Sequence, residues 1–326
     1  MRKIILSLML ISFISSAVAN AGQLQKLIDA AQPNSTITVK KGVYKEPIVI
    51  KKPLKLICEK GAVIDGLGKD DVVTIKNTKD VLIKGCVLRH SGTHGWKMDA
   101  GVKIVNARNC TVENNRILDC LYGIVTKTAK NCKLIGNEIA SKKGYSEGAK
   151  GDAIRLWWSP NVLVKDNYVH DSRDVTSMFS NGVVFENNRV ENSHIGTMVV
   201  NSNANRIIGF KGKNNEVSLL LNCAEDCTIK DFNIKDDGKY RGLVMIRASN
   251  THVSNGLIEN CKKGLVVNLS PAKAGTKNYF DNIKLHNNEI GIYIHTTAKQ
   301  RSRNIFRNIE YKNNKTNFMD EWKTHK

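Results

Sequence analysis

The sequence predicts an all-β fold, a single-stranded right-handed parallel β-helix with coils of 21 to 30 residues. Two repeated patterns predict it. The nonapeptide Asn-x-x-[Val/Ile/Leu]-x-x-Asn-x-[Ile/Val] begins at residues 109, 131 and 161, and it recurs without its first Asn at 182. Later in each coil comes Gly-[apolar]-x-[apolar]-x-x-[Ser/Thr], as in residues 264–270 and 291–297. Strands this short cannot bury an apolar face alone, so the copies must stack.

The ends of the chain indicate how it is organised. Arg2 and Lys3 precede a short apolar run, and Ala19-Asn20-Ala21 form an A-x-A cleavage site, which together predict a secretory signal peptide over residues 1–21. An uncleaved anchor is the alternative. We assign residues 22–315 to the β-helix and residues 316–326 to a C-terminal tail.

The second Asn of the first repeat falls at one corner of successive coils. Stacked side-chain amides there can bond each other and the turn backbone. We therefore predict a structural Asn ladder, made of Asn115, Asn137, Asn167 and Asn188. The same position later holds Phe232, Gly256, Ile283 and Ile309, which confines the ladder to the middle coils.

The second repeat predicts an apolar strip on the outside of the coils. Side chains alternate along a strand, and the inward set in this register is uniformly apolar. The outward set should be polar, yet it is also largely apolar. A contiguous exposed apolar strip usually marks a docking surface, and a covering loop or C-terminal segment is the alternative. The predicted partner-docking residues are Arg155, Trp157, Met198, Val200, Val244 and Ile246.

The formal charge of +20 is compatible with several classes of partner. An exported basic protein meets acidic polysaccharide, anionic lipid or acidic protein before nucleic acid, so we exclude nucleic acid as a partner. A lysine surface that only aids solubility is the alternative.

The eight cysteines leave two pairs to consider. Cys110 and Cys132 occupy the same place in adjacent coils, where strand spacing brings them together as a disulfide, a soft-metal thiol pair or stacked buried hydrophobes. Cys223 and Cys227 flank a corner and leave the same three options open.

Nearly the whole chain resembles the NosD family. The region from residue 24 to 92, residues 100–124 (AGVKIVNARNCTVENNRILDCLYGI) and residues 151–174 (GDAIRLWWSPNVLVKDNYVHDSRD) carry the resemblance. It implies an exported, periplasmic β-helix that is not an enzyme. It also implies an accessory role beside an ABC transporter in assembling the copper–sulfur centre of nitrous oxide reductase. The family fold further resembles carbohydrate-binding and sugar-hydrolase β-helices.

One coil departs from the family pattern. Relatives have a coil of the form RYGLHYMYS, whereas residues 194–202 read HIGTMVVNS, with Met198 at the family's His and Val200 at its Met. We expect no firmly bound cofactor. Cu(I) prefers thioether and imidazole donors. For transient copper contact the best set is Met178, His194 and Met198, each of which alone is a packing or surface residue.

Carboxylates provide the case for an enzyme, a polysaccharide lyase or glycosidase of the cell envelope. Asp70-Asp71 and Asp236-Asp237 lie at coil corners, where turn formation explains them. Asp152, Arg155, Arg173 and Asp174 form a charged cluster beside Trp157, which we interpret as ion pairs across coils. A carbohydrate-binding or polysaccharide-processing protein remains the alternative function.

Overall fold

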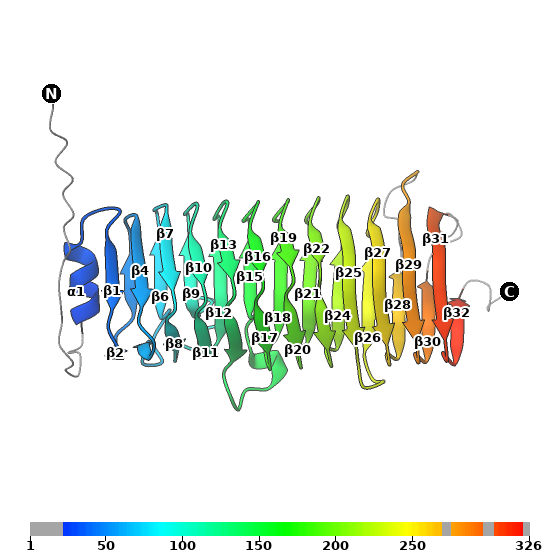
Figure 1. The fold of residues 1–326 in the computed structure, drawn as a ribbon, viewed down its shortest axis with the longest axis horizontal. Coiled ribbons are helices and arrows are strands. Elements are labelled where there is room, and N and C mark those ends of the chain that lie inside the picture. The colour runs from blue at the N-terminus through cyan, green and yellow to red at the C-terminus, as the bar shows by residue number, and fades with distance from the viewer. Residues whose placement is uncertain (1–21, 269–274, 296–302, 322–326) are drawn as a thin grey trace, which may run out of the picture.

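The computed structural model describes residues 22–268, 275–295 and 303–321, and the expected signal peptide lies outside them. These residues form a right-handed parallel β-solenoid of about 11 turns, which confirms the predicted fold class. Figure 1 shows the coils side by side along the long axis. Two parallel sheets make the wall, one of twelve strands and one of twenty within the described residues.

The twelve-stranded sheet contributes one strand to each coil. Its strands are β3 (Ile48–Ile50), β6 (Val73–Lys76), β9 (Ala100–Val105), β12 (Tyr122–Lys127), β15 (Ile154–Trp157), β18 (Asp174–Met178), β21 (Ile195–Val200), β24 (Val217–Asn222), β26 (Arg241–Ile246), β28 (Lys263–Asn268), β30 (Ile290–His295) and β32 (Thr316–Asp320). Because β32 belongs to this sheet, the solenoid continues to Asp320, and the boundary we expected at residue 315 is too early.

The twenty-stranded sheet contributes two short strands to each early coil. These are β1 (Thr36–Val39), β2 (Gly42–Lys45), β4 (Leu54–Cys58), β5 (Ala62–Asp65), β7 (Val81–Lys84), β8 (Val87–Arg89), β10 (Thr111–Glu113), β11 (Arg116–Cys120), β13 (Lys133–Ile135), β14 (Glu138–Ser141), β16 (Leu163–Lys165), β17 (Tyr168–His170), β19 (Val184–Glu186), β20 (Arg189–Glu191), β22 (Arg206–Ile208) and β23 (Lys211–Lys213). Later coils contribute one long strand each, namely β25 (Thr228–Lys235), β27 (His252–Glu259), β29 (Asn278–His286) and β31 (Asn304–Lys312).

The corner between the paired short strands is held by buried asparagines. The Asn137 Oδ1 atom accepts hydrogen bonds from the backbone N–H and the side-chain amide of Asn115, both at 3.1 Å. Asn137 donates in turn to Asn167, and Asn167 to Asn188, with the same pair of bonds. Each of the four side chains is at most 3% exposed. The ladder satisfies backbone groups that the corner would otherwise bury without partners.

The ladder ends one coil before the corner changes. Phe210 takes its position between β22 and β23, and Phe232 takes it within β25, from which coil onward the two short strands merge into one long strand. Other corners carry further ladders that the nonapeptide did not predict. Ser159, Ser180 and Ser202 bond successive backbone N–H groups, while Asn278 and Asn304 form one late ladder and Asn288 and Asn314 another.

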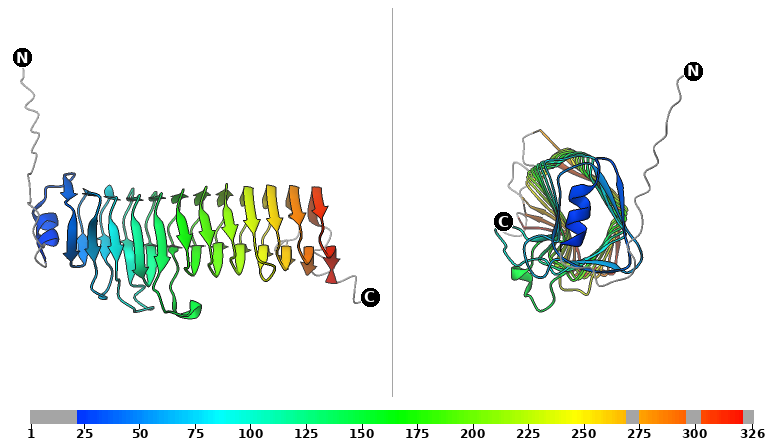
Figure 2. Two further views of the ribbon diagram at one scale, coloured as in Figure 1. Left: turned by 60° about the horizontal axis from the view of Figure 1, so that its bottom comes forward. Right: turned by 90° about the vertical axis from the view of Figure 1, so that its left-hand side faces the viewer.

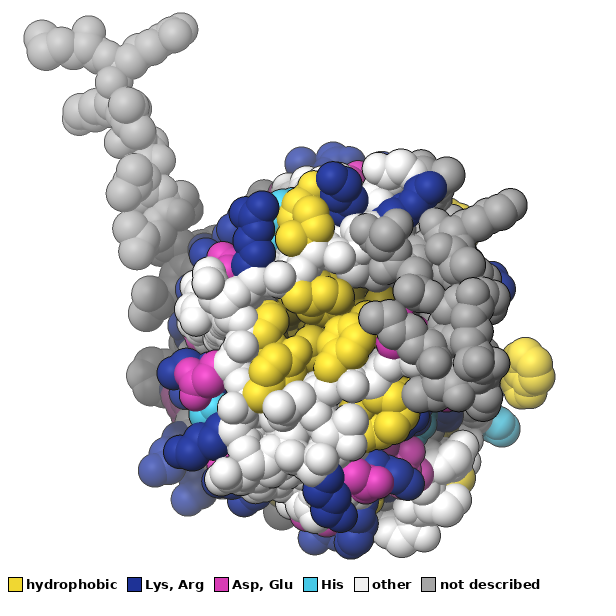
Figure 3. Space-filling model, turned by 90° about the vertical axis from the view of Figure 1, so that its right-hand side faces the viewer, with side chains coloured by type: hydrophobic (Ala, Val, Ile, Leu, Met, Phe, Trp, Pro, Cys, Tyr) yellow, Lys and Arg dark blue, Asp and Glu magenta, His cyan; other side chains and the backbone are white. Residues whose placement is uncertain are grey.

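The two ends of the solenoid differ. Helix α1 (Gln23–Ala30) covers the N-terminal end, where Leu24 and Ile28 pack on the core and Glu46 accepts the free N–H groups of Leu24 and Gln25 (Figure 2). At the other end, apolar side chains of the interior reach the surface (Figure 3), and Phe318 is 44% exposed. The apolar interior therefore has a helical cap on one side among the described residues.

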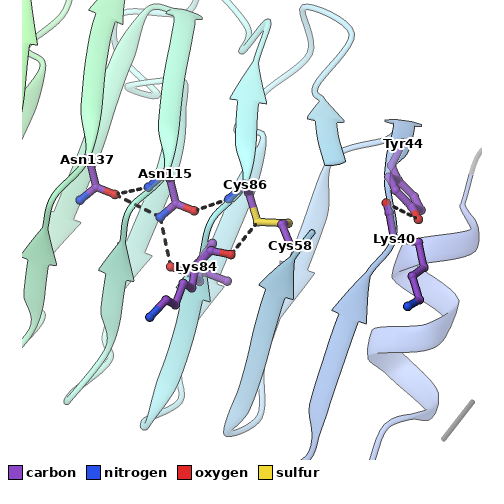
Figure 4. The surroundings of a disulfide bond; sticks show 8 residues. Lys40, Tyr44, Cys58, Lys84, Cys86, Asn115 and Asn137 are labelled. Carbon is purple, nitrogen blue, oxygen red and sulfur yellow. Dashed lines mark hydrogen bonds between the residues drawn. A yellow bond between two sulfur atoms is a disulfide. The ribbon is translucent and has the colours of Figure 1, made fainter. Parts of the chain in front are cut away.

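The disulfide lies between coils near the N-terminal end, at a pair of cysteines that the sequence did not single out. Cys58 and Cys86 are bonded, and the Cys86 N–H donates to Asn115, so the disulfide adjoins the start of the Asn ladder (Figure 4). Cys110 and Cys132 are buried free thiols that donate to the backbone carbonyls of Arg108 and Lys130, so the disulfide option is not realised there.

Cys223 and Cys227 are not bonded either. Cys223 is half-buried in a left-handed corner position, whereas Cys227 is 3% exposed within the core. The two side chains thus lie in different environments on either side of the corner. This arrangement explains why closeness in sequence does not pair them.

Asn137→Ala removes a residue that bonds both of its ladder neighbours. The buried backbone N–H of Asn115 loses its acceptor and the Asn167 Oδ1 loses one of its two donors, so we expect unfolding free energy to fall by about 3 kcal/mol. Urea unfolding followed by circular dichroism measures this. Lys133→Ala, on an exposed side chain of the same coil, should change it by less than about 0.5 kcal/mol. Equal effects of the two substitutions would contradict the ladder's role.

Alkylation of the native protein tests the thiol assignments. Burial raises the pKa of Cys120 to about 12 and that of Cys227 to about 11, which keeps both protonated and unreactive. Iodoacetamide should therefore modify Cys223 first, and Cys223→Ser should stay unlabelled on the same timescale. Denatured but unreduced protein should show six thiols by mass. Four thiols would mean that a second pair closes.

Candidate functional site

The outer face of the twelve-stranded sheet carries two columns of side chains in register. In one column Trp157 lies beside Met178, and Met178 beside Val200. In the other, Arg155 and Thr176 are followed by an apolar run, which consists of Met198, Leu220, Val244 and Val266. The coil stacking thus places the predicted docking residues on strands of one face, between β15 and β26 (Figure 1).

From Ile195 onward, outward side chains form an apolar cluster separate from the core, and Trp157, Met178 and Val200 are not among its members. Ile195, Val217, Val244 and Val266 are its buried members, with Met198, Leu220, Ile246 and Tyr293 packed against them. We call the two columns from Trp157 to Tyr293 the outer strip. Trp157, Met198, Val200 and Ile246 are half-buried, as a docking face requires, but Val244 is only 3% exposed. The expectation of an exposed strip is therefore wrong for Val244, because larger neighbours surround it.

Two aromatic residues beside the strip were missed. Trp158 and Phe179 occupy the left-handed corner that follows β15 and β18, with φ of 51° at both. Their rings stack with centroids 4.7 Å apart, and Trp158 is 55% exposed. Asn occupies this corner in other coils, as at Asn106 and Asn201, so large aromatics there are unusual. The replacement of that Asn by Trp and Phe was the available sequence signal.

Trp157 is held between two cations. The Arg155 guanidinium lies 5.4 Å from the centroid of its ring, and the Lys127 Nζ lies 6.0 Å from it. Arg155 also reaches the Tyr122 hydroxyl at 3.4 Å. These contacts fix the orientation of Trp157 at the N-terminal end of the outer strip.

A charged cluster adjoins this end of the strip. Asp152 lies 3.6 Å from Arg155, and Asp174 lies 3.5 Å from Arg173. Both pairs form within one coil, whereas we expected them to cross between coils. The contact that does cross joins His194 to Asp174 at 2.8 Å. The local pairs arise because each partner is three residues or fewer away in sequence.

The connection from β14 to β15 covers part of the same sheet face. It contains η1 (Glu147–Ala149) and projects from the side of the solenoid (Figure 2). Under it, Tyr122 and Val125 belong to a second outer cluster, in which both are buried. Gly151 lies so close to the Tyr122 ring that a Cβ there would approach it to 2.5 Å. The outer strip therefore begins where this loop ends.

The remaining aspartate doublets serve turns, as the sequence indicated. Asp70 has a left-handed φ of 42°, and Asp237 accepts the N–H of Lys239 two residues on. Asp71 is buried and bonds Thr74, the backbone of Ala100 and Lys103. Asp70 and Asp237 thus serve turns, whereas Asp71 joins its own coil to the next one.

The residues proposed for copper do not converge. Met178 ends β18, whereas His194 contacts Asp174 at the start of that strand, and Met198 pairs with Thr176 between them. The neighbouring Cys132 thiol and, after it, burial raise the pKa of Cys110, which opposes a thiolate at Cys110 of the kind that Cu(I) requires. Among the described residues no group of three or more His, Cys, Asp or Glu could hold a metal ion. The donor set does not fit a firmly bound copper ion.

Asp152 makes stability depend on pH. Burial is the main cause that raises its pKa to about 6 from an ordinary 3.8. The unfolded chain loses this proton near pH 4 and the folded chain only near pH 6, so stability falls as pH rises through that window. In Asp152→Asn this contribution is absent. The stability of the variant relative to wild type should therefore rise by up to about 3 kcal/mol between pH 4 and pH 7.5.

Urea unfolding at pH 4, 5, 6 and 7.5 measures how the difference in unfolding free energy between Asp152→Asn and wild type changes with pH. Loss of the contact with Arg155 adds a constant to this difference and does not affect its change with pH. Asp166→Asn, on an exposed corner carboxylate, is the matched control and should parallel wild type. A constant difference between Asp152→Asn and wild type at all four pH values would show that Asp152 does not have the raised pKa.

Two known proteins that carry the same name are similar to this chain in sequence. A protein of Stutzerimonas stutzeri named "Probable ABC transporter binding protein NosD" is 32% identical over 134 residues, which cover 41% of this chain and 30% of that protein. Its namesake from Pseudomonas aeruginosa is 27% identical over 134 residues, covering 41% and 31%. The matched segment thus spans less than a third of the length of these relatives.

Solved structures share the fold. The A-module of the mannuronan C-5 epimerase AlgE4 of Azotobacter vinelandii superposes with a TM-score of 0.68 at 14% identity, over 92% of this chain and 94% of that one. At this identity the likeness concerns the fold alone. Within the described residues, no helix combines the length and apolar character needed to cross a membrane.

The family described as "Periplasmic copper-binding protein (NosD)" matches residues 60–148 and 140–326, which together take in most of the chain and the whole of the outer strip. The chain therefore belongs to the NosD family.

Proposed function

We propose that this chain is an exported, periplasmic accessory protein that docks a partner through the outer strip while the copper–sulfur centre of nitrous oxide reductase is assembled. The observation that carries the proposal is the apolar cluster on the outside of the twelve-stranded sheet, flanked by the exposed Trp158–Phe179 stack. Trp is the residue most enriched among docking hot spots, and a stacked pair presents a rigid surface. Family membership supports the accessory role.

An ABC transporter is the second partner in the proposal. Two relatives carry the name of an ABC transporter binding protein, and the segment they share with this chain covers 41% of it. Copper would pass through transiently, because Met178, His194 and Met198 do not form a closed site. Accordingly, the chain contributes a docking scaffold and no resident cofactor.

Turnover is not part of the proposal. A glycosidase needs two carboxyl groups free to face one substrate, and a lyase needs clustered carboxylates and a basic proton acceptor. Asp152 and Asp174 are each 5% exposed or less and contact arginine side chains, and His194 contacts Asp174. Groups engaged with one another in this way hold the loop and strand ends together.

Carbohydrate binding is a second candidate because of one observation. The exposed Trp158–Phe179 stack offers a flat aromatic face of the kind on which other planar or apolar ligands pack. The basic net charge would favour acidic glycans, whose binding should weaken with added salt. This candidate would assign the same aromatic residues to a sugar in place of a protein.

Affinity capture with the partners as defined targets tests the proposal. Tagged wild type and Trp157→Ala would be incubated with detergent-solubilised envelope, and nitrous oxide reductase and the ABC transporter subunits would be quantified by targeted mass spectrometry. We expect wild type to retain both and the recovery by Trp157→Ala to fall at least about tenfold, the effect of removing an aromatic anchor.

Lys211→Ala, on an exposed side chain of the twenty-stranded sheet, is the matched control and should retain both targets. If wild type recovers neither target and instead binds alginate or polygalacturonate on a glycan array, the carbohydrate-binding function replaces the accessory role. Equal recovery by wild type and Trp157→Ala would remove the outer strip from the docking site.

A further inference from the structure

We infer that three connections on one side of the solenoid form a contact for an anionic phospholipid bilayer. The connections are residues 66–72, 90–99 and 142–153, and we call them the three loops. The inference goes beyond the proposed function and does not depend on it. Three observations carry it: the loops share one corner, each exposes an apolar side chain, and each has an exposed lysine close to that side chain.

The three loops occupy the same corner of their coils. Each follows the second short strand of the twenty-stranded sheet and leads into the twelve-stranded sheet, at β6, β9 and β15. These are the second, third and fifth strands of that sheet, so the outer two lie three strand spacings, or about 14 Å, apart. Figure 2 shows the second and third loops projecting from one side of the solenoid.

Hydrogen bonds between coils hold the bases of the loops. The Gly68 N–H donates to the His90 carbonyl at 2.8 Å, which joins the first loop to the second. The Leu121 N–H, between β11 and β12, donates to the Ser91 Oγ atom at 2.8 Å. Gly151 in the third loop donates in turn to the Leu121 carbonyl at 3.0 Å. The stacked coils therefore fix the loops relative to one another.

Each loop exposes one large apolar side chain. Leu67 is 46% exposed, Trp96 101% and Tyr145 37%. These are three of the six large apolar side chains that are exposed within the described residues. Their concentration at one corner indicates a contact surface. Trp and Tyr are the side chains that membrane proteins place at the level of the lipid headgroups.

An exposed lysine accompanies each apolar side chain. Lys69, Lys97 and Lys143 lie within two residues of it in the sequence. Asp70 is the one exposed carboxylate of the three loops, all of whose residues the structure describes, and it lies 3.5 Å from the Lys97 Nζ atom. Glu147 is half-buried and the other loop carboxylates are buried. Lysines can pack their stems along an apolar surface while their ammonium groups meet anionic headgroups.

The spacing of the loops favours a bilayer over other partners. Between the second and third loops the connection is tight, since β11 ends at Cys120 and β12 begins at Tyr122. The exposed side chains are therefore separate projections. A bilayer interface can admit each of them on its own, whereas a folded protein needs a continuous complementary surface. A sugar site would need several polar side chains converging on one aromatic ring.

Vesicle flotation tests the inference. Residues 22–326 are the form to use, because the apolar run of the expected signal peptide would bind lipid by itself. Vesicles of phosphatidylcholine alone are compared with vesicles that hold equal parts of phosphatidylcholine and phosphatidylglycerol. We expect binding at least about tenfold tighter to the vesicles with phosphatidylglycerol, and weaker binding as salt is added.

Apolar variants locate the contact. Leu67→Ser with Trp96→Ser should weaken binding about tenfold or more, because two side chains that enter the interface are lost. Trp158→Ser removes an exposed Trp of another corner and should bind these vesicles as wild type does. Brominated phosphatidylcholine in the mixed vesicles should quench the fluorescence of wild type. It should leave that of Trp96→Phe, which keeps an apolar side chain, unquenched. Circular dichroism confirms that each variant is folded.

Charge variants separate a local contact from general attraction. Glu in place of Lys69, Lys97 and Lys143 should weaken binding about tenfold or more. The matched control makes the same charge change on exposed residues of the twenty-stranded sheet, Arg206, Lys211 and Lys213. It should weaken binding less than about threefold.

Several results would overturn the inference. These are no binding to phosphatidylglycerol vesicles, equal losses in the two charge variants, and full binding by the Leu67/Trp96 variant. Binding of alginate that is lost in Trp96→Ser, without vesicle binding, would make the loops a sugar contact and overturn the bilayer assignment. Capture of the reductase that depends on Trp157 is independent of all these results, so the docking proposal stands or fails separately.

Discussion

The corner hydrogen bond is the constraint on which this solenoid depends. Each coil must bend inward several times, and each bend turns backbone N–H groups toward a dry interior. Asn115, Asn137, Asn167 and Asn188 solve this with one side chain per coil, because each amide accepts from the coil before and donates to the coil after. The bonds run along the axis, so the polar groups that permit the bend also fix the register between coils.

The register between coils determines which side chains lie next to one another on the outer face of the twelve-stranded sheet. Because strands of the twelve-stranded sheet stack directly, one apolar choice per coil becomes a continuous column, as from Met198 to Val266. The Asn corner gives way to Phe210, and one coil later, at Phe232, the opposite wall straightens into longer strands, yet the columns of the strip continue unbroken. Changes at the other corners of the coil therefore do not alter the register of the outer strip.

Sequence periodicity was sufficient to predict the fold, the inward set and the Asn ladder, because all three depend on local spacing repeated along the chain. Periodicity did not predict contacts made at the corners of the coils, because the repeat does not show which corner a residue occupies. Cys58 ends β4, whereas Cys86 lies in the corner between β7 and β8, so the two are not at equivalent positions of the repeat and their pairing had no visible pattern. Trp158 and Phe179 were overlooked because outward strand positions, and not corners, were treated as the surface.

The left-handed corners also separate stability from binding. A residue with a β-carbon in this conformation costs about 1 kcal/mol, and Asn tolerates it best. At Trp158 and Phe179 the chain gives up that advantage twice on adjacent coils, and it sets two rings in a geometry that a relaxed strand would not provide. The many Asn corners thus stabilise the solenoid enough to hold the strained Trp158–Phe179 pair. Substitutions at this pair can therefore change what the surface binds without changing the fold.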